Sequence, residues 1–137
     1  MTEQEKKELQ ERVKSVIERV NNAAVQAGRD PSEITLVAAT KMNDAERVQA
    51  AIEAGIRVCG ENRVQELQEK YEQNAYDGAD LQFIGTLQTN KVKYIAPFVR
   101  LIHSVDSARL AEAIQKEAAK CGRTIDILLE IHVAEEE

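Results

Sequence analysis

An apolar segment that ends in an amine stands at residues 34–41, with the sequence Ile34-Thr35-Leu36-Val37-Ala38-Ala39-Thr40-Lys41. Its β-branched and small apolar residues predict a buried strand, and Lys41 comes where that strand ends. Apolar walls at the lip of a sheet desolvate an ammonium group and lower its pKa, which prepares the amine for a Schiff base with an aldehyde. A lone lysine in such a place is more often an inert surface residue, so the neighbouring segments must decide.

The rest of the sequence alternates strand-like and helix-like segments. A first helix is predicted from the helical spacing of apolar residues between Leu9 and Ala27, with a capping-box spacing of Thr2 and Glu5. Strands are predicted at 35–40, 56–59, 81–84, 101–105 and 125–133. The helices between them are expected to begin near Asn43, Asn62, Asn90 and Ser107.

Repeated βα units predict a parallel sheet with right-handed crossovers, either an open doubly wound sheet or a (β/α)8 barrel. The sequence lacks GxGxxG after the first strand, the dinucleotide fingerprint of the open fold. Polar residues cluster after the strands, where barrel active sites lie. We therefore predict an α/β fold of the parallel (β/α)8 TIM-barrel type, truncated after about five strands, because a complete barrel needs about 250 residues. Residues 135–137 would then begin a severed loop.

Composition limits the classes of function. The net charge of -6 over 137 residues argues against a general nucleic-acid surface. No apolar run approaches the ~20 residues of a membrane span, and the first residues lack the apolar stretch of a signal peptide. Cys59 and Cys121 form no CxxC and are expected to be reduced thiols, so the expected location is cytoplasmic.

Four motifs occur in a fixed order along the chain. They are LVAATK at 36–41, GENRVQE at 60–66, FIGTLQTNK at 83–91 and IHSVD at 102–106. Together they resemble the pyridoxal phosphate homeostasis proteins, the YggS/PROSC family, over nearly the whole chain. The resemblance implies a barrel like that of fold-type III pyridoxal phosphate (PLP) enzymes such as alanine racemase.

The resemblance also implies a function and a site. It makes residues 1–137 the N-terminal part of a single PLP-binding barrel domain, with the phosphate-binding segment expected beyond the given sequence. Lys41 corresponds to the lysine that holds PLP as a Schiff base, and Asn62 to an asparagine near the cofactor. The role implied is non-catalytic: intracellular PLP homeostasis, with PLP-requiring apo-enzymes as possible recipients. Gln88, Asn90 and Lys91 match a motif whose individual roles stay unassigned.

Two other functions stay open, a racemase-like or Schiff-base enzyme on the same barrel and an interaction module in which Lys41 is inert. A racemase needs a base on each face of its substrate, and the sequence offers only Lys41. The remaining candidate residues have simpler interpretations. Glu61 is expected to support the following helix, Lys91 and Lys93 to be solvated, Asp106 and Ser107 to cap a helix, and His103 and His132 to bind no metal. Gln82 stands where many of the family have His.

Overall fold

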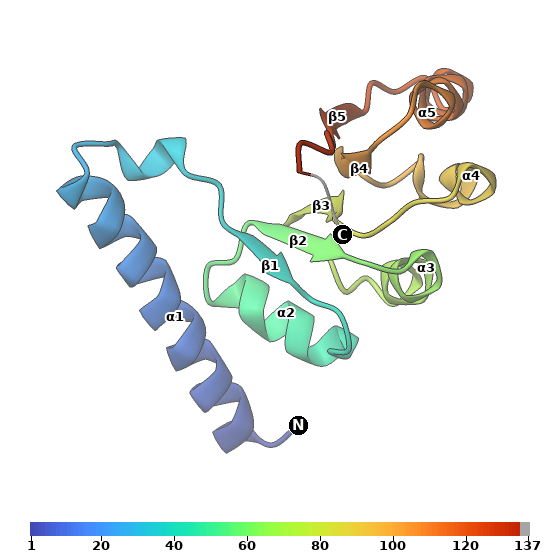
Figure 1. Ribbon diagram of the computed structural model, residues 1–137. Coiled ribbons are helices and arrows are strands. Elements are labelled where there is room, and N and C mark those ends of the chain that lie inside the picture. The colour runs from blue at the N-terminus through green and yellow to red at the C-terminus, as the bar shows by residue number, and fades with distance from the viewer. Residues whose placement is uncertain (135–137) are drawn as a thin grey trace.

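The computed structural model describes residues 1–134 and contains a five-stranded parallel sheet in the order β1-β2-β3-β4-β5 (Figure 1). The strands are β1 (Val37–Ala39), β2 (Val58–Glu61), β3 (Asp80–Phe83), β4 (Leu101–Val105) and β5 (Asp126–Leu129). Each strand pairs with the next one along the chain, so the carboxyl ends of all five meet at one edge of the sheet. The predicted fold class is confirmed: four consecutive βα units and a fifth parallel strand form part of a parallel barrel.

Helices connect the strands, and three of the α-helices begin at side-chain caps. They are α1 (Glu3–Gln26), α2 (Ala45–Glu53), α3 (Val64–Glu72), α4 (Val92–Ile95) and α5 (Ala108–Lys120), with the short 3-10 helices η1 (Pro31–Glu33) and η2 (Thr89–Lys91). Thr2 and Glu5 form the predicted capping box of α1, and the Ser107 hydroxyl accepts from the Leu110 amide. None of the helices within residues 1–134 is both long and apolar enough to cross a bilayer.

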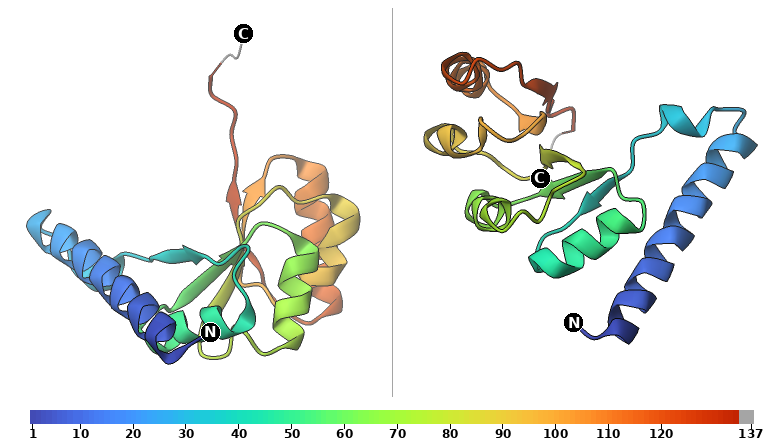
Figure 2. Two further views of the ribbon diagram at one scale, coloured as in Figure 1. Left: turned by 90° about the horizontal axis from the view of Figure 1, so that it is seen from below. Right: turned by 180° about the vertical axis from the view of Figure 1, so that it is seen from behind.

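The core lies between the sheet and one layer of helices. Helices α2 to α5 cover the convex face of the curved sheet, and α3, α4 and α5 lie side by side in all three views (Figures 1 and 2). Alternate strand residues point to this face, and they pack with the apolar stripe of each helix; the buried set includes Cys59, Leu81, Phe83, Ile102, Leu67, Ile95 and Ile114. Helix α1 lies outside this layer, packed against α2.

Several predicted boundaries are wrong by a few residues. Strand β1 ends at Ala39, before Lys41, and β5 ends at Leu129, well short of Val133. The side chain that caps α2 is Asp44, and α3 follows Arg63, whose side chain makes no cap bond, rather than Asn62. The helix expected over 90–95 is divided into η2 and α4. The loop expected at residues 135–137 lies outside the described residues.

The two outer strands of the sheet predict self-association. Within residues 1–134, β1 pairs only with β2 and β5 only with β4, and unpaired strand edges attract other chains. Apolar side chains on and after β5 are exposed, with Leu129 at 68% and Ile131 at 71%. We expect this 137-residue chain to form oligomers in sedimentation velocity, and Leu129→Lys to shift it towards monomer by placing a charge on the edge.

Val25→Lys is the matched control for that experiment, because Val25 is 62% exposed but lies on α1, away from the β5 edge. It should leave the association unchanged. A wild-type chain that stays monomeric across the concentration range would contradict the edge argument.

Candidate functional site

The candidate site lies at the carboxyl edge of the sheet, where the turns after the first strands adjoin. Ala39 of β1 pairs with Gly60 of β2, and Gly60 pairs with Gln82 of β3. The turn that carries Lys41 therefore starts beside residues 60–62, the GEN segment. The GEN segment also adjoins Gly85. The sequence motifs that singled out Lys41 and Asn62 are brought to the same edge by this pairing.

Lys41 occupies a tight turn, two residues after β1 ends. The Asn43 amide donates to the Thr40 carbonyl at 3.2 Å, which closes a turn over residues 40–43. Met42 has a φ of 63°, the left-handed value that a type II turn requires at its third position. The Lys41 side chain is exposed, and its amine has no hydrogen bond or ion pair within residues 1–134. Because β1 ends at Ala39, the alternation of side chains along the strand does not continue to Lys41.

A buried carboxylate, Glu61, lies directly beneath the turn. Glu61 is fully buried at the end of β2, on the helix-covered face. Its Oε2 accepts from the Thr40 hydroxyl at 2.8 Å, from Lys70 Nζ at 2.9 Å and from the Tyr76 hydroxyl at 2.5 Å. Glu61 therefore joins β1, α3 and the loop before β3, a larger role than the support of one helix that the sequence predicted.

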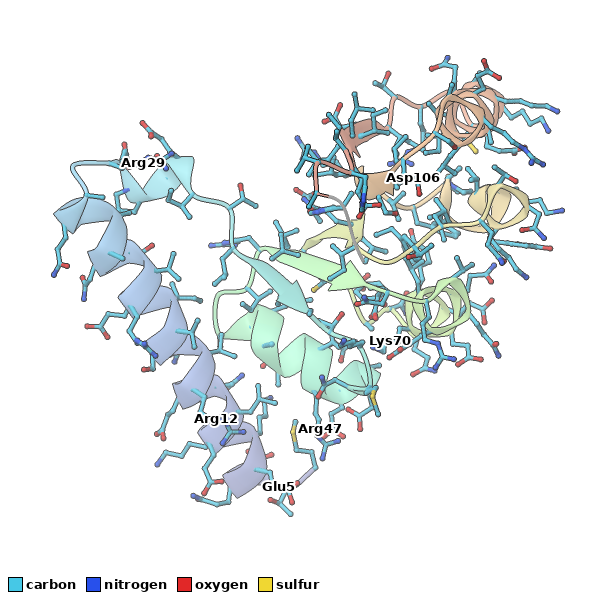
Figure 3. All side chains as sticks on the ribbon, viewed as in Figure 1. Glu5, Arg12, Arg29, Arg47, Lys70 and Asp106 are labelled. Carbon is cyan, nitrogen blue, oxygen red and sulfur yellow. The ribbon has the colours of Figure 1, made fainter. Side chains whose placement is uncertain are left out.

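Lys70 and Glu66 extend this cluster to the backbone of the turn. Lys70 comes from α3 and points towards the turn between β1 and α2 (Figure 3). Its Nζ donates to the Thr40 carbonyl at 2.6 Å and lies 2.7 Å from Glu66 Oε2. The same Glu66 oxygen accepts from the Met42 amide at 2.6 Å. The only sequence signal for this arrangement is the i,i+4 spacing of Glu66 and Lys70 on a helix, which usually indicates a surface pair.

Protonation follows from these contacts. Burial raises the pKa of Tyr76, and the hydrogen bond to the Glu61 carboxylate raises it further, so Tyr76 remains a donor. For Glu66, burial raises the pKa, but the bonds from Lys70 and the Met42 amide outweigh it, and the net pKa is lowered. A lowered carboxyl pKa stabilises the fold at neutral pH, and this contribution is lost as the pH falls through that lowered value.

Asn62 presents a buried oxygen that no described group satisfies. Its Oδ1 is inaccessible to solvent and has no hydrogen-bond partner within residues 1–134. Its backbone is held closely by the next turn, since a Cβ at Gly85 would lie only 2.3 Å from the Asn62 carbonyl oxygen. Buried polar atoms without a partner are rare and costly, so Asn62 Oδ1 is a candidate ligand contact.

The other polar residues of this edge have structural partners. His103 Nε2 lies 2.6 Å from Gln82 Oε1, and the Ser104 hydroxyl donates to the Gly85 carbonyl. Lys91 and Lys93 are exposed and lie 5.6 and 5.2 Å from the Tyr94 ring centre. Within residues 1–134 no three His, Cys, Asp or Glu side chains gather in a way that could hold a metal ion.

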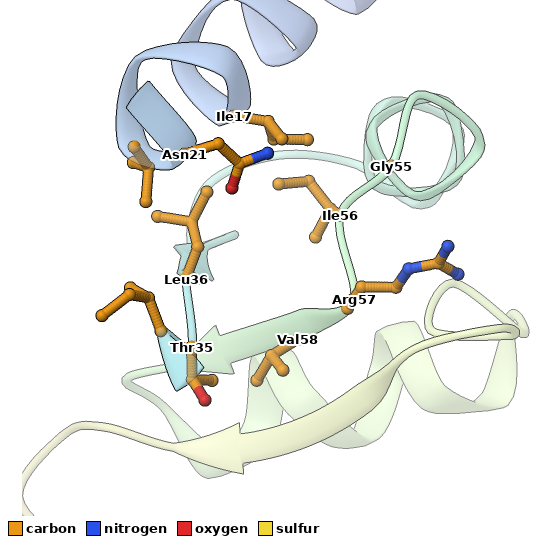
Figure 4. A pocket seen from close by; sticks show the side chains of 10 residues that line it. Ile17, Asn21, Thr35, Leu36, Gly55, Ile56, Arg57 and Val58 are labelled. Carbon is orange, nitrogen blue, oxygen red and sulfur yellow. The ribbon is translucent and has the colours of Figure 1, made fainter. Parts of the chain in front are cut away.

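Two cavities lie near the first two strands, one of them away from this site and one beside it. One of about 240 Å³ opens between α1 and the amino ends of β1 and β2, at the opposite end of the strands from Lys41; Ile17, Leu36 and Ile56 line it (Figure 4). The other, of about 630 Å³, lies between residues 42–45 and α3. Met42, Glu66 and Lys70 line the second cavity, but neither Lys41 nor Asn62 lines either of the two.

Comparison with known proteins confirms the resemblance carried by the motifs. A pyridoxal phosphate homeostasis protein of Aquifex aeolicus (strain VF5) is 45% identical over 129 residues, which are 93% of this chain and 56% of that protein. The protein of the same name from Escherichia coli (strain K12) is 33% identical over 124 residues, 88% of this chain and 53% of that protein. The chain thus spans about half the length of the curated relatives it matches. No protein-family model matches the chain.

Solved structures also resemble this chain over most of its length. A protein of Bifidobacterium adolescentis superposes with a TM-score of 0.84 at 37% identity, covering 93% of this chain and 56% of that one. PipY of Synechococcus elongatus PCC7942, in its structure with PLP bound, gives a TM-score of 0.70 at 32% identity, over 84% of this chain and 55% of that one.

The buried ion pair of the site should dominate local stability. Lys70→Met leaves the Glu61 carboxylate buried without its cation, and breaking such a pair costs about 3–5 kcal/mol. We expect that loss in the free energy of unfolding measured by urea titration. Lys93→Met removes an exposed lysine and should change stability by no more than about 0.5 kcal/mol. Equal stabilities of the two variants would show that the pair is not needed for the fold.

Proposed function

We propose that the chain is the N-terminal part of a single PLP-binding barrel domain that serves in PLP homeostasis. The chain is homologous to pyridoxal phosphate homeostasis proteins over about half of their length. In this proposal Lys41 holds PLP as a Schiff base, and the protein stores or delivers the cofactor within the cell. The observation that carries the proposal is that two groups without partners within residues 1–134 lie at the same edge of the sheet. They are the exposed amine of Lys41 and the buried amide oxygen of Asn62. The free thiols of Cys59 and Cys121 support a cytoplasmic location.

The residues present fit the cofactor in chemical type. PLP supplies an aldehyde, with which a primary amine forms a Schiff base. Lys41 offers that amine, and its exposed turn gives the aldehyde access. Asn62 Oδ1 is an acceptor that needs a donor, and its contact would orient the bound ring. The absence of a general nucleic-acid surface, inferred from the net charge of -6, is consistent with a small-molecule ligand.

We propose binding without catalysis, with PLP-requiring apo-enzymes as the partners that receive the cofactor. A racemase-like enzyme is the alternative, and it would need a second acid-base group opposite Lys41. His103 on β4 is one candidate, but its Nε2 already lies 2.6 Å from Gln82 Oε1. The name shared by the relatives from Aquifex aeolicus and Escherichia coli also supports a homeostatic role.

Lys41→Ala tests the central claim. PLP added to the wild-type chain should be trapped on Lys41 by borohydride reduction and located there by peptide mass spectrometry. Lys41→Ala should lose this adduct altogether, because no other group replaces the amine. Lys93→Ala, which removes an exposed lysine elsewhere, should retain it. An adduct of undiminished yield in Lys41→Ala would disprove the assignment, and measurable amino-acid racemisation by the wild type would favour the enzyme.

Asn62→Ala tests the second residue. Losing one hydrogen bond to the bound ligand costs about 1–1.5 kcal/mol, so the Kd for PLP in an absorbance titration should rise about tenfold. The fold should persist, because Asn62 Oδ1 has no partner to lose within residues 1–134. Asn22→Ala, on the exposed side of α1, serves as the control. An unchanged Kd and spectrum in Asn62→Ala would remove Asn62 from the site.

A further inference from the structure

Both peptide groups that flank Lys41 are held by side chains of one helix. The carbonyl of the preceding peptide, from Thr40, accepts from Lys70 Nζ at 2.6 Å. The amide of the following peptide, from Met42, donates to Glu66 Oε2 at 2.6 Å. Glu66 and Lys70 stand four residues apart on α3 and bind each other at 2.7 Å. Glu66 and Lys70 therefore hold the backbone on both sides of Lys41 by hydrogen bonds, and we call these two residues the clamp.

We propose that Glu66 and Lys70 are positioning residues that aim the Lys41 amine. The proposal rests on the role of Lys41 given above. The φ and ψ angles of a residue are set by the planes of its two flanking peptides, so anchoring both planes fixes the direction in which the Lys41 side chain leaves the backbone. An amine that is already held in one direction loses less conformational entropy when it reacts with an aldehyde.

The clamp is built as a rigid unit. An ammonium group has three donors, and Lys70 Nζ has three acceptors in reach: the Thr40 carbonyl, Glu61 Oε2 at 2.9 Å and Glu66 Oε2. Lys70 is 6% exposed and Glu61 is fully buried, so water competes little for these bonds. With all its protons engaged, the Lys70 amine is unsuited to react with an aldehyde itself, although it lies close to Lys41 in the chain's folded form.

The clamp also stabilises the unfavourable backbone conformation of Met42. Its φ of 63° is unfavourable for a residue with a side chain, and its side chain is 91% exposed and so gains little from packing. The hydrogen bond from its amide to Glu66 helps to offset that cost. Loss of Glu66 would release the turn and let Lys41 sample other directions, while the Glu61–Lys70 pair beneath it remained.

Glu66→Ala and Glu66→Gln separate positioning from stability. Both remove the negative charge beside Lys70, so both should lower the free energy of unfolding, Glu66→Gln by less because it keeps the bond to the Met42 amide. Only Gln retains an oxygen that can accept from the Met42 amide. We expect the rate of PLP adduct formation on Lys41 to fall about tenfold in Glu66→Ala, within the range that misplacement of a reacting group costs, and to be largely retained in Glu66→Gln.

Glu69→Ala is the matched control, since Glu69 is an exposed acid on the same helix whose partner is Gln65. Hydrogen exchange of the Met42 amide gives a readout independent of PLP: protection should be lost in Glu66→Ala and kept in Glu66→Gln and Glu69→Ala. Equal adduct rates in wild type and Glu66→Ala, with Lys41→Ala inactive, would overturn the clamp and leave the proposed function intact. Undiminished adduct in Lys41→Ala would overturn both.

Discussion

The buried Glu61–Lys70 ion pair is the constraint on which the candidate site depends. An ion pair removed from water must recover its desolvation cost through good geometry and further hydrogen bonds. Here Thr40 and Tyr76 donate to Glu61 Oε2, and Glu66 accepts from Lys70, whereas Glu61 Oε1 has no partner within residues 1–134. Because these residues come from the turn after β1, from α3 and from the loop before β3, the pair can form only when these elements are in place. Satisfying the charge therefore also builds the turn that carries Lys41.

Close backbone packing sets the second half of the site. Gly60 lacks a Cβ, which lets the side chains of Val37 and Ile84 approach its backbone, and Gly85 lets the turn after β3 lie directly against the Asn62 backbone. Side chains at these two positions would push apart the turns after β1, β2 and β3. The glycines of the GEN and FIG motifs thus explain why the turns adjoin, whereas Lys41 and Asn62 supply the polar groups that the adjoining turns present.

The order of elements could be predicted from the sequence because the apolar runs and caps are local signals. Thr2 and Ser107 cap their helices as the spacing indicated. The end of β1 could not be predicted, because the left-handed Met42 is stabilised by Glu66 from another element. An apolar run such as that at 127–129 is typical of a strand buried on both faces, yet Leu128 and Leu129 are 49% and 68% exposed, since burial depends on neighbours and not on the run alone. Lys70 looked like an ordinary surface lysine, and only the folded arrangement reveals its three acceptors.

Lys70 and Lys41 carry identical side chains in one chain, yet their surroundings differ. Lys70 is enclosed, and each of its three protons has an oxygen to receive it. Lys41 follows a strand that is too short to carry it inward, and the turn leaves its amine exposed. An amine already saturated with hydrogen bonds must break them before it can attack an aldehyde, whereas an amine without partners need only lose a proton. The acceptors that make Lys70 structural therefore support the proposal that Lys41, and not Lys70, is the amine that reacts with the aldehyde.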